Sequence, residues 1–309
     1  MSQNIKIKVV GVGGSGSNAV SRMKKCKIQG VELIAINTDA QDLQKTKADL
    51  KVRIGRKVTQ GLGTGMNPEI GKLAAEEQRE EIQEILRGSD MVFVTCGLGG
   101  GTGSGASPVV AEIAKNLGAL TTAVVTRPFS FEGISRQKIA EAGIKDLREK
   151  VDSLIAISND KLLEILDPKT TVISAFWTCD DVLRQAVQGI SDLITLPGII
   201  NVDFADVRTI MKNSGTALFG LGLAQGEKRA EMAVKSALNS PLLGVSPKGA
   251  KGVLFNVSGG KDISLSEINQ IGEIITQEIN SEAKVIFGAI QDEKLGKGEI
   301  KVTLIATGF

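Results

Sequence analysis

Residues 5–18, IKIKVVGVGGSGSN, run from an apolar segment directly into a turn built of glycine and serine. The apolar part, 5–13, predicts a buried strand, and a helix is expected from about residue 18 to residue 25. The turn matches G-x-G-x-x-G at Gly11, Gly13 and Gly16, between a strand and a helix as that motif requires. Glycine has no Cβ atom, so this backbone can approach a phosphate closely. The turn therefore predicts a phosphate site, with tight strand–helix packing as the alternative.

A second glycine-rich segment, GLGGGTGSG at 97–105, follows an apolar strand expected at 91–96 and precedes a helix expected from about 108 to 117. Ordering that many glycines costs conformational entropy, which favours a second anion-binding turn over a flexible linker. Thr102 and Ser104 add hydroxyl donors. The chain has no Gly-Lys-Ser or Gly-Lys-Thr, so a P-loop lysine is excluded. Two such turns in one sheet predict that one polyphosphate is held by backbone amides, hydroxyls and Mg²⁺.

The pattern around these turns alternates strands with helices. Further strands are expected at 31–37, 119–126 and 153–158, and the segment 68–88 predicts a helix that ends at Gly88. Such alternation is typical of an α/β fold, a doubly wound parallel sheet covered on both faces.

The later part of the chain has a different pattern. A long central helix is expected from Asp180 to about residue 196, and helices near 227–239 and 264–280 then alternate with strands near 217–223, 252–258, 284–290 and 299–306. The last two strands are consecutive, which predicts a smaller α+β domain with a mixed sheet. We expect a nucleotide-binding domain at 1–176, the central helix and a connector at 177–200, and a C-terminal domain at 201–309.

Composition excludes several classes of protein. The 309 residues contain no histidine, which rules out imidazole-based triads and histidine metal ligands. Aromatic residues are 3% of the chain and the formal charge is +2, so neither nucleic-acid binding nor attraction to a membrane surface is indicated. No apolar run is long enough for a membrane helix, and the N-terminus does not resemble a signal peptide. Three well-separated cysteines favour a reduced, cytosolic compartment without a zinc site.

One alternative enzyme class fits the first turn. Gly11, Gly13 and Gly16, with Asp39 at the end of the next strand, also match a Rossmann dinucleotide site, and so a nicotinamide-dependent oxidoreductase. That class has no use for the second glycine segment.

Several longer segments resemble the FtsZ family of bacterial cell-division proteins, within the tubulin/FtsZ superfamily. In the family's order and spacing they are NTDAQDL (37–43), GGGTGSG (99–105), RPFSFEGISR (127–136), ISNDKLL (157–163), DDVLRQAVQGISDLI (180–194) and NVDFADVRTIM (201–211). The resemblance runs from about residue 5 to the end of the chain. It implies that the α/β domain is a GTPase domain and that the protein is a polymerising cytoskeletal GTPase.

The resemblance also implies the setting of that activity. Subunits are expected to join head to tail into protofilaments of the division ring in the cytoplasm, with the hydrolysis site completed between neighbouring subunits. Expected partners are the protein itself, division-ring proteins and membrane tethers, without nucleic acid or direct membrane insertion. The family's C-terminal linker and tether peptide are not found in this sequence, so we expect a truncated chain. A non-catalytic relative of the superfamily is a further alternative.

The resemblance implies particular roles for residues of both domains. GTP or GDP, with Mg²⁺ held mainly by phosphates and water, is expected to contact Gly14, Ser15, Gly16, Ser17, Asn18, Asn37, Gly99, Gly100, Gly101, Thr102, Gly103, Glu132, Arg136, Asn159, Phe176 and Asp180. The catalytic loop, acting on the next subunit's nucleotide, is expected to comprise Asn201, Asp203 and Asp206. No metal ligand is expected among the protein side chains.

Physical reasoning supports some of these roles and leaves others open. A carboxylate such as Asp180 can accept two N–H donors from guanine and none from adenine in the same pose, although Asp180 is also placed to cap the long helix. Asp203 and Asp206 lie three residues apart at a helix start, which also fits capping. Neither glycine segment supplies a general base, so a carboxylate from elsewhere is needed to orient water.

The sequence departs from the family pattern at several positions. Ser15 and Ser17 stand where many members have glycine, and nucleotide binding with altered affinity is expected. Trp177 and Cys179, beside the proposed guanine site, are unusual. Trp177 is expected in the core, and the alternative is that it is the bulkiest residue near the pocket. The nearly neutral charge, in a family that is usually acidic, favours bundling of filaments.

Overall fold

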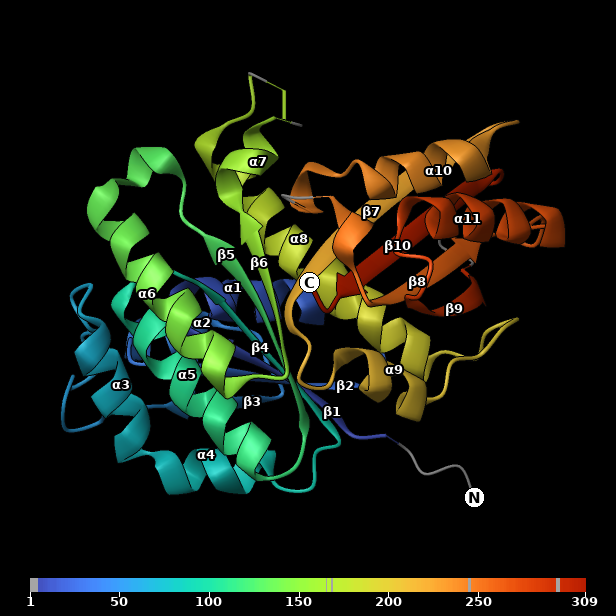
Figure 1. Cartoon of the computed structure of the whole chain (residues 1–309). Coiled ribbons are helices and arrows are strands. Elements are labelled where there is room, and N and C mark those ends of the chain that lie inside the picture. Colours follow the sequence, from blue (N-terminus) through green and yellow to red (C-terminus); the bar gives the residue numbers. More distant parts are fainter. Residues whose placement is uncertain (1–4, 165, 168, 244–245, 293–294) are drawn as a thin grey trace. The chain divides into compact units, whose positions relative to one another are not determined.

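The computed structural model describes residues 5–164, 166–167, 169–243, 246–292 and 295–309 (Figure 1). The chain divides into two compact units, Met1–Gln188 and Gly189–Phe309. One helix, α8 (Val172–Thr195), begins in the first unit and ends in the second. The three-part division expected from the sequence, with boundaries at 176 and 200, stays a prediction.

The first unit contains a sheet in which every pair of neighbouring strands is parallel. Its order is β3-β2-β1-β4-β5-β6, and the parallel pairing confirms the doubly wound sheet expected from the sequence. Register sets Gly11 of β1 opposite both Ala35 of β2 and Thr95 of β4, so these strands end at the same edge. The strands are β1 (Ile7–Val12), β2 (Val31–Asn37), β3 (Leu50–Arg53), β4 (Met91–Gly97), β5 (Leu120–Arg127) and β6 (Ser153–Ser158).

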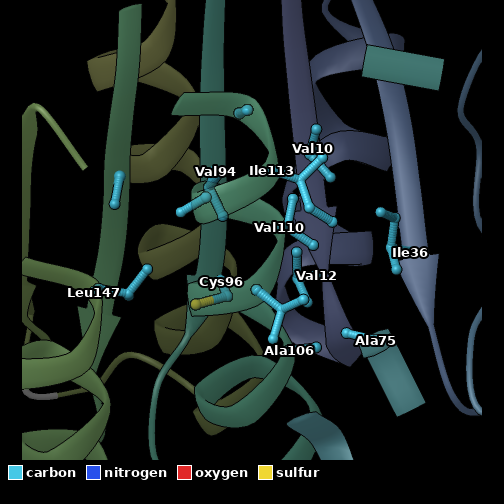
Figure 2. Close-up of a cluster of buried hydrophobic side chains, with 14 of the residues drawn as sticks. Val10, Val12, Ile36, Ala75, Val94, Cys96, Ala106, Val110, Ile113 and Leu147 are labelled. Atoms are coloured by element: carbon cyan, nitrogen blue, oxygen red, sulfur yellow. The ribbon is translucent and has the colours of Figure 1, made fainter. Parts of the chain in front are cut away.

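Helices cover both faces of this sheet. On one face, Ala106, Val110 and Ile113 of α5 pack over Val10 and Val94 (Figure 2). The next residue of β1, Gly11, faces the other way and lies against Val20 of α1, because side chains alternate along a strand. The helices are α1 (Gly13–Lys25), α2 (Ala40–Lys45), α3 (Pro68–Glu77), α4 (Arg79–Leu86), α5 (Gly101–Asn116), α6 (Ile134–Lys150) and α7 (Asn159–Leu163), with a short 3-10 turn, η1 (Ser130–Glu132).

The second unit has the expected mixed sheet, in the order β7-β10-β8-β9. Strand β10 is antiparallel to β7 and β8, whereas β8 and β9 are parallel. Helix α10 lies close to β7, because Gly222 has no side chain and a Cβ there would be 1.9 Å from the carbonyl oxygen of Ala233. The elements are α9 (Phe204–Met211), β7 (Gly215–Gln225), α10 (Arg229–Leu238), η2 (Pro241–Leu243), η3 (Pro247–Gly249), β8 (Gly252–Gly259), α11 (Leu265–Glu278), β9 (Lys284–Gln291) and β10 (Glu299–Thr307).

Four helix boundaries differ from the sequence expectation. Helices α1 and α5 begin at Gly13 and Gly101, inside the segments expected to be turns, because the glycines there are needed for close packing. The single helix expected over 68–88 is two helices that meet at Gln78. Helix α8 begins eight residues before Asp180, where the Thr171 hydroxyl accepts a hydrogen bond from the Ser174 amide at 3.2 Å.

In the described part of the chain, no helix is both long and apolar enough to cross a bilayer.

Candidate functional site

The two glycine segments meet at the carboxyl edge of the sheet in the first unit. Gly13 has φ +72°, and a Cβ atom on it would lie 3.0 Å from the Gly103 amide nitrogen. Ser15 fits against Gly97, whose missing Cβ would come within 2.7 Å of the Ser15 oxygen. The amide-bearing starts of α1 and α5 are therefore brought together, which is the arrangement that binds anions.

Some of these glycines are also needed for close packing. A Cβ on Gly11 would lie 2.2 Å from the Gly16 carbonyl oxygen, and one on Gly16 would lie 2.5 Å from the Thr95 carbonyl oxygen. On the other segment, a Cβ on Gly101 would meet the Thr64 hydroxyl at 2.3 Å. The packing interpretation of the first turn thus holds for Gly11 and Gly16, while Gly14 is exposed.

A cavity of about 300 Å³ opens over the two segments. Its walls come from both glycine segments, the loop before α3, the start of α6, and helices α7 and α8, all within the first unit. The lining residues are Val12, Gly13, Gly14, Ser15, Thr64, Met66, Gly97, Leu98, Gly100, Gly101, Thr102, Gly103, Thr126, Pro128, Glu132, Arg136, Asn159, Phe176, Cys179 and Asp180.

Four buried threonine hydroxyls link separate segments beside the glycines. The Thr102 oxygen lies 2.7 Å from that of Thr38, at the end of β2, and 3.3 Å from that of Thr64. The Thr59 hydroxyl donates to the Thr38 carbonyl oxygen at 3.4 Å and to that of Gly55 at 3.0 Å. The start of α5, the end of β2 and the loop before α3 are thereby linked at one point of the cavity wall.

An ion pair and an aromatic cluster form another wall. Arg136 donates to Glu132 at 2.9 Å, and the same carboxylate accepts the Phe129 amide at 2.9 Å. The Phe129 ring stacks on Phe131 at 4.9 Å and meets Phe176 edge-on at 5.3 Å. Phe176, 40% exposed, is therefore held as an apolar surface at the cavity.

A buried acid and a buried amide line the cavity on α8 and α7. Asp180 lies in the third turn of α8, so the alternative that it caps the helix is wrong. Burial raises its pKa to about 7, the Arg22 guanidinium opposes this shift, and Asp181 adds to it. The Asn159 Oδ1 atom is buried and has no hydrogen-bond partner within the described residues. Both side chains thus have polar atoms that can form hydrogen bonds with a ligand.

The structure brings together most of the residues expected to bind nucleotide. Eleven of the sixteen line the cavity: Gly14, Ser15, Gly100, Gly101, Thr102, Gly103, Glu132, Arg136, Asn159, Phe176 and Asp180. The remaining five are not among the lining residues: Gly16, Ser17, Asn18, Asn37 and Gly99. Ser17 is fully buried, Asn18 is exposed, and Asn37 donates to Asp42 at 2.7 Å.

The expected catalytic loop lies in the second unit. Asn201, Asp203 and Asp206 are exposed, before and within the first turn of α9. Asp203 occupies the N-cap position, but its side chain makes no capping hydrogen bond. Asn201 accepts the Gly198 amide at 2.7 Å, which fixes the loop between α8 and α9.

Several cavity residues were not anticipated from the sequence. Thr64 and Met66 belong to a loop whose Gly61, Gly63 and Gly65 have positive φ, and that run of glycines was the available signal. Cys179, which the sequence placed beside the guanine site, does line the cavity; burial raises the pKa of its thiol to about 12, so the thiol is neutral. Arg22 lies outside the cavity lining, 3.8 Å from Asp180, and no local pattern links these two distant residues. Trp177 is 56% exposed, so the expectation that it lies in the core is wrong.

Comparison with known proteins agrees with this geometry. Residues 6–167 match the family described as Tubulin/FtsZ family, GTPase domain, and residues 215–309 match FtsZ family, C-terminal domain. An empty FtsZ dimer from M. jannaschii is 49% identical, with TM-score 0.96, over 100% of this chain and 89% of that one. A mutant of FtsZ from the same organism is 50% identical, with TM-score 0.95, over 98% and 91%. A GTPγS-bound CetZ2 protofilament from Haloferax volcanii shares the fold, with TM-score 0.82 and 21% identity over 98% and 92%.

The parallel sheet, the paired glycine segments and these matches define a GTPase of the tubulin/FtsZ class. Within that class, the full-length similarity and the matched C-terminal domain show that the chain belongs to the FtsZ family. The oxidoreductase alternative is wrong. Asp39, its expected ribose ligand, instead caps α2 by accepting the Gln41 and Asp42 amides.

Proposed function

We propose that the chain binds GTP and GDP in the cavity of its first unit, with the phosphates over the two glycine segments. The observation that carries this proposal is the backbone contact of Gly13 with Gly103, which brings two helix N-termini to one point. Helix N-termini offer unpaired amides and a positive dipole end, so together they suit a polyphosphate. The hydroxyl of Thr102, in the same wall, adds a donor.

The guanine base is proposed to lie among Asn159, Phe176 and Asp180. Ionised Asp180 has only acceptor atoms, which suit the adjacent N1–H and amino donors of guanine. The unpartnered Asn159 oxygen, buried as far as the described residues show, offers a further acceptor. The Phe176 ring supplies an apolar surface against which a base can stack.

Hydrolysis is proposed to require a second subunit. The two carboxylates that line the cavity have other roles: Glu132 binds Arg136 and the Phe129 amide, and Asp180 is assigned to the guanine base. An attacking water needs another carboxylate to orient it. The exposed Asp203 and Asp206, with Asn201, are the proposed source, supplied by an adjoining copy in a head-to-tail filament. Similarity to a dimer and to a protofilament supports self-association.

Mg²⁺ is proposed to accompany the nucleotide. Oxygen ligands suit this ion, and the Thr102 hydroxyl is an available oxygen beside the glycine segments. We expect the ion to be held mainly by phosphates and water. When bound, Mg²⁺ neutralises charge on the phosphates.

The cellular role proposed here is a filament of the cytoplasmic division ring, with other ring proteins and membrane tethers as partners. Membership of the FtsZ family supports this role. Depleting the protein from its own cells should block division while growth continues, and a fluorescent fusion should gather at the division site. Normal division after depletion would contradict the role.

GTP hydrolysis per subunit, measured against protein concentration with Mg²⁺, tests the shared site. Activity should be near zero when the protein is dilute and rise above a threshold, because each site needs a neighbour. Equal activity per subunit at every concentration would show a site complete within one chain. GDP binding without hydrolysis at any concentration would favour a non-catalytic relative.

A variant with a matched control locates the catalytic carboxylate. Asp203→Ala should keep GDP affinity and lose hydrolysis. When the variant is mixed with wild type, it should lower the GTP hydrolysis of the mixed filaments. Ser264→Ala removes the N-cap of α11 in the same unit, where Ser264 accepts the Glu267 amide, and should leave hydrolysis unchanged. Loss of GDP binding in the Asp203 variant would contradict action on a neighbouring subunit.

A further inference from the structure

The guanidinium group of Arg22, on α1, lies between two residues of α8. Its central carbon is 4.5 Å from the centroid of the Trp177 ring, and its Nη2 atom is 3.8 Å from Oδ2 of Asp180. Trp177 and Asp180 are three residues apart, so they share one face of the helix. One cation thus contacts an aromatic face and a carboxylate at once.

The separation of Arg22 and Asp180 has a chemical consequence. At 3.8 Å the charges attract strongly, but the atoms are too far apart for a hydrogen bond. The carboxylate is therefore stabilised as an anion while its lone pairs stay free for another donor. The Arg22 Nε atom is buried and lacks a hydrogen-bond partner among the described residues, so stacking on Trp177 is what holds the group.

Asp180 depends on this cation, because its other charged neighbours offer no compensation. Its pKa is raised to about 7 by burial, Arg22 pulls it down, and Asp181 on the same helix pushes it up. Asp181 is itself bound by Arg184 at 2.7 Å. Glu132 of η1 and Arg136 of α6 line the same cavity and form an ion pair with each other at 2.9 Å.

We propose that Arg22 is a positioning residue for guanine recognition: braced on Trp177, it keeps Asp180 an anion with free lone pairs facing the cavity. This inference rests on the proposed binding of guanine nucleotides. Arg22 and Trp177 do not line the cavity. They act through Asp180, whose anion accepts both N1–H and the 2-amino group of guanine. Protonated Asp180 cannot accept both donors, so the affinity for guanine nucleotides decreases as the pH is lowered through neutrality.

The test measures binding of GDP and inosine diphosphate, which lacks the 2-amino group, from about pH 6 to about pH 9. Wild type should lose GDP affinity as the pH falls through about 7. Arg22→Met should raise the midpoint of that loss by about one unit or more, because an opposite charge at this distance lowers a carboxyl pKa by that amount. At pH near 7 the variant should bind GDP at least about fivefold more weakly, because a one-unit rise reduces the ionised fraction from about one half to about one eleventh, and its affinity should recover at high pH.

Further variants separate charge from packing. Arg22→Lys keeps the cation and should restore much of the wild-type profile, whereas Asp180→Asn should bind weakly with a flat profile. Lys25→Met, at an exposed position on the same helix, should match wild type. Trp177→Leu, which changes a half-exposed side chain, releases Arg22 to bond Asp180 directly and should lower the preference for GDP over inosine diphosphate.

The outcomes decide the inference. If Arg22→Met leaves GDP affinity unchanged, or weakens it by the same factor at every pH, then Arg22 contributes packing and has no effect on the charge of Asp180. If Arg22→Met does not fold, the Trp177→Leu protein provides the test. An unchanged preference of that protein for GDP over inosine diphosphate would overturn the proposal. Wild type that binds GDP without pH dependence overturns this inference alone. Wild type that binds no GDP at any pH overturns the proposed function as well.

Discussion

A Cβ atom on Gly105 of α5 would lie 1.9 Å from the carbonyl oxygen of Pro68, so α3 and α5 touch through their backbones. Gly71 of α3 makes the reciprocal approach, since its Cβ would lie 2.3 Å from the Gly101 carbonyl oxygen. The glycine segment at the start of α5 thus faces the cavity on one side and packs directly against α3 on the other. Its glycines provide open amides on one side and close packing on the other.

Gly105→Ala should therefore destabilise the first unit by about 1–3 kcal/mol, because the methyl group can fit only if α3 moves away. Urea unfolding measures this cost, and GDP affinity should fall with it because Gly101 and Thr102 shift. Gly272→Ala in α11 is the control: a Cβ there meets only the Phe255 ring, at 3.9 Å. It should stabilise its helix by up to about 1 kcal/mol. If the two substitutions change the free energy of unfolding equally, the close backbone contact between α3 and α5 does not limit the size of the side chain at residue 105.

Thr102→Val removes the hydroxyl that connects Thr38 with Thr64, and leaves both buried groups short of a partner. We expect a loss of about 1–3 kcal/mol in the free energy of unfolding, together with weaker GDP binding. Thr122→Val is a matched control, because its buried hydroxyl pairs with Ser153 at 2.9 Å inside the sheet. That change should lower stability and spare GDP affinity. A Thr102→Val protein with normal GDP affinity would remove the hydroxyl from the phosphate site.

Asp180→Asn should stabilise the nucleotide-free protein at high pH. The pKa of Asp180 rises from 3.8 to about 7 on folding, so the native state binds the extra proton between these values and stability falls as pH rises through them. The amide removes this cost. We expect a gain of about 1–3 kcal/mol above pH 7, reduced because Arg22 loses its counter-charge, and no gain below about pH 4. Thermal melts across pH measure it, and a less stable variant at pH 8 would contradict the expectation.

Arg229→Met should destabilise the second unit. The buried guanidinium binds Glu267 at 2.6 Å and Asp262 at 2.5 Å, and lowers the pKa of Glu267 to about 2. A lowered carboxyl pKa stabilises the fold above its ordinary value of 4.5, and that contribution is lost as pH falls towards 2. The variant should lose about 1–3 kcal/mol at neutral pH and less in acid.

The control for Arg229 is an exposed pair. Lys235→Met removes the i,i+4 bridge to Glu231 on α10, at 2.5 Å, and should cost less than about 0.5 kcal/mol. Denaturant unfolding at two pH values compares the variants. An Arg229→Met protein that loses the same stability at acid and neutral pH would show that the arginine contributes packing alone.

The elements were predictable from the sequence where periodicity is strong. The strands at 31–37 and 153–158 agree with prediction at both ends, because buried parallel strands are short apolar runs bounded by polar or glycine residues. The start of α8 was not predictable in this way. Asp180 is a good capping residue, but Thr171 caps earlier and the apolar residues between them continue the helix.

The candidate site was predictable where its residues are consecutive in the chain. Gly100 to Gly103 line the cavity as a continuous segment, and Asn159 directly follows β6. Thr64 and Arg22 were missed, because their partners Thr102 and Asp180 are far away in sequence.

By itself, then, the sequence determined the class of fold, the family and the two glycine segments, because strand periodicity and glycine-rich turns are local properties of the chain. Which glycines face the cavity and which pack depends on the folded arrangement, as Gly14 and Gly16 illustrate. Only the tertiary structure placed Arg22 beside Asp180, thereby setting the charge at the proposed guanine site. Contacts between distant segments depend on how helices pack on the sheet, and no local pattern encodes that.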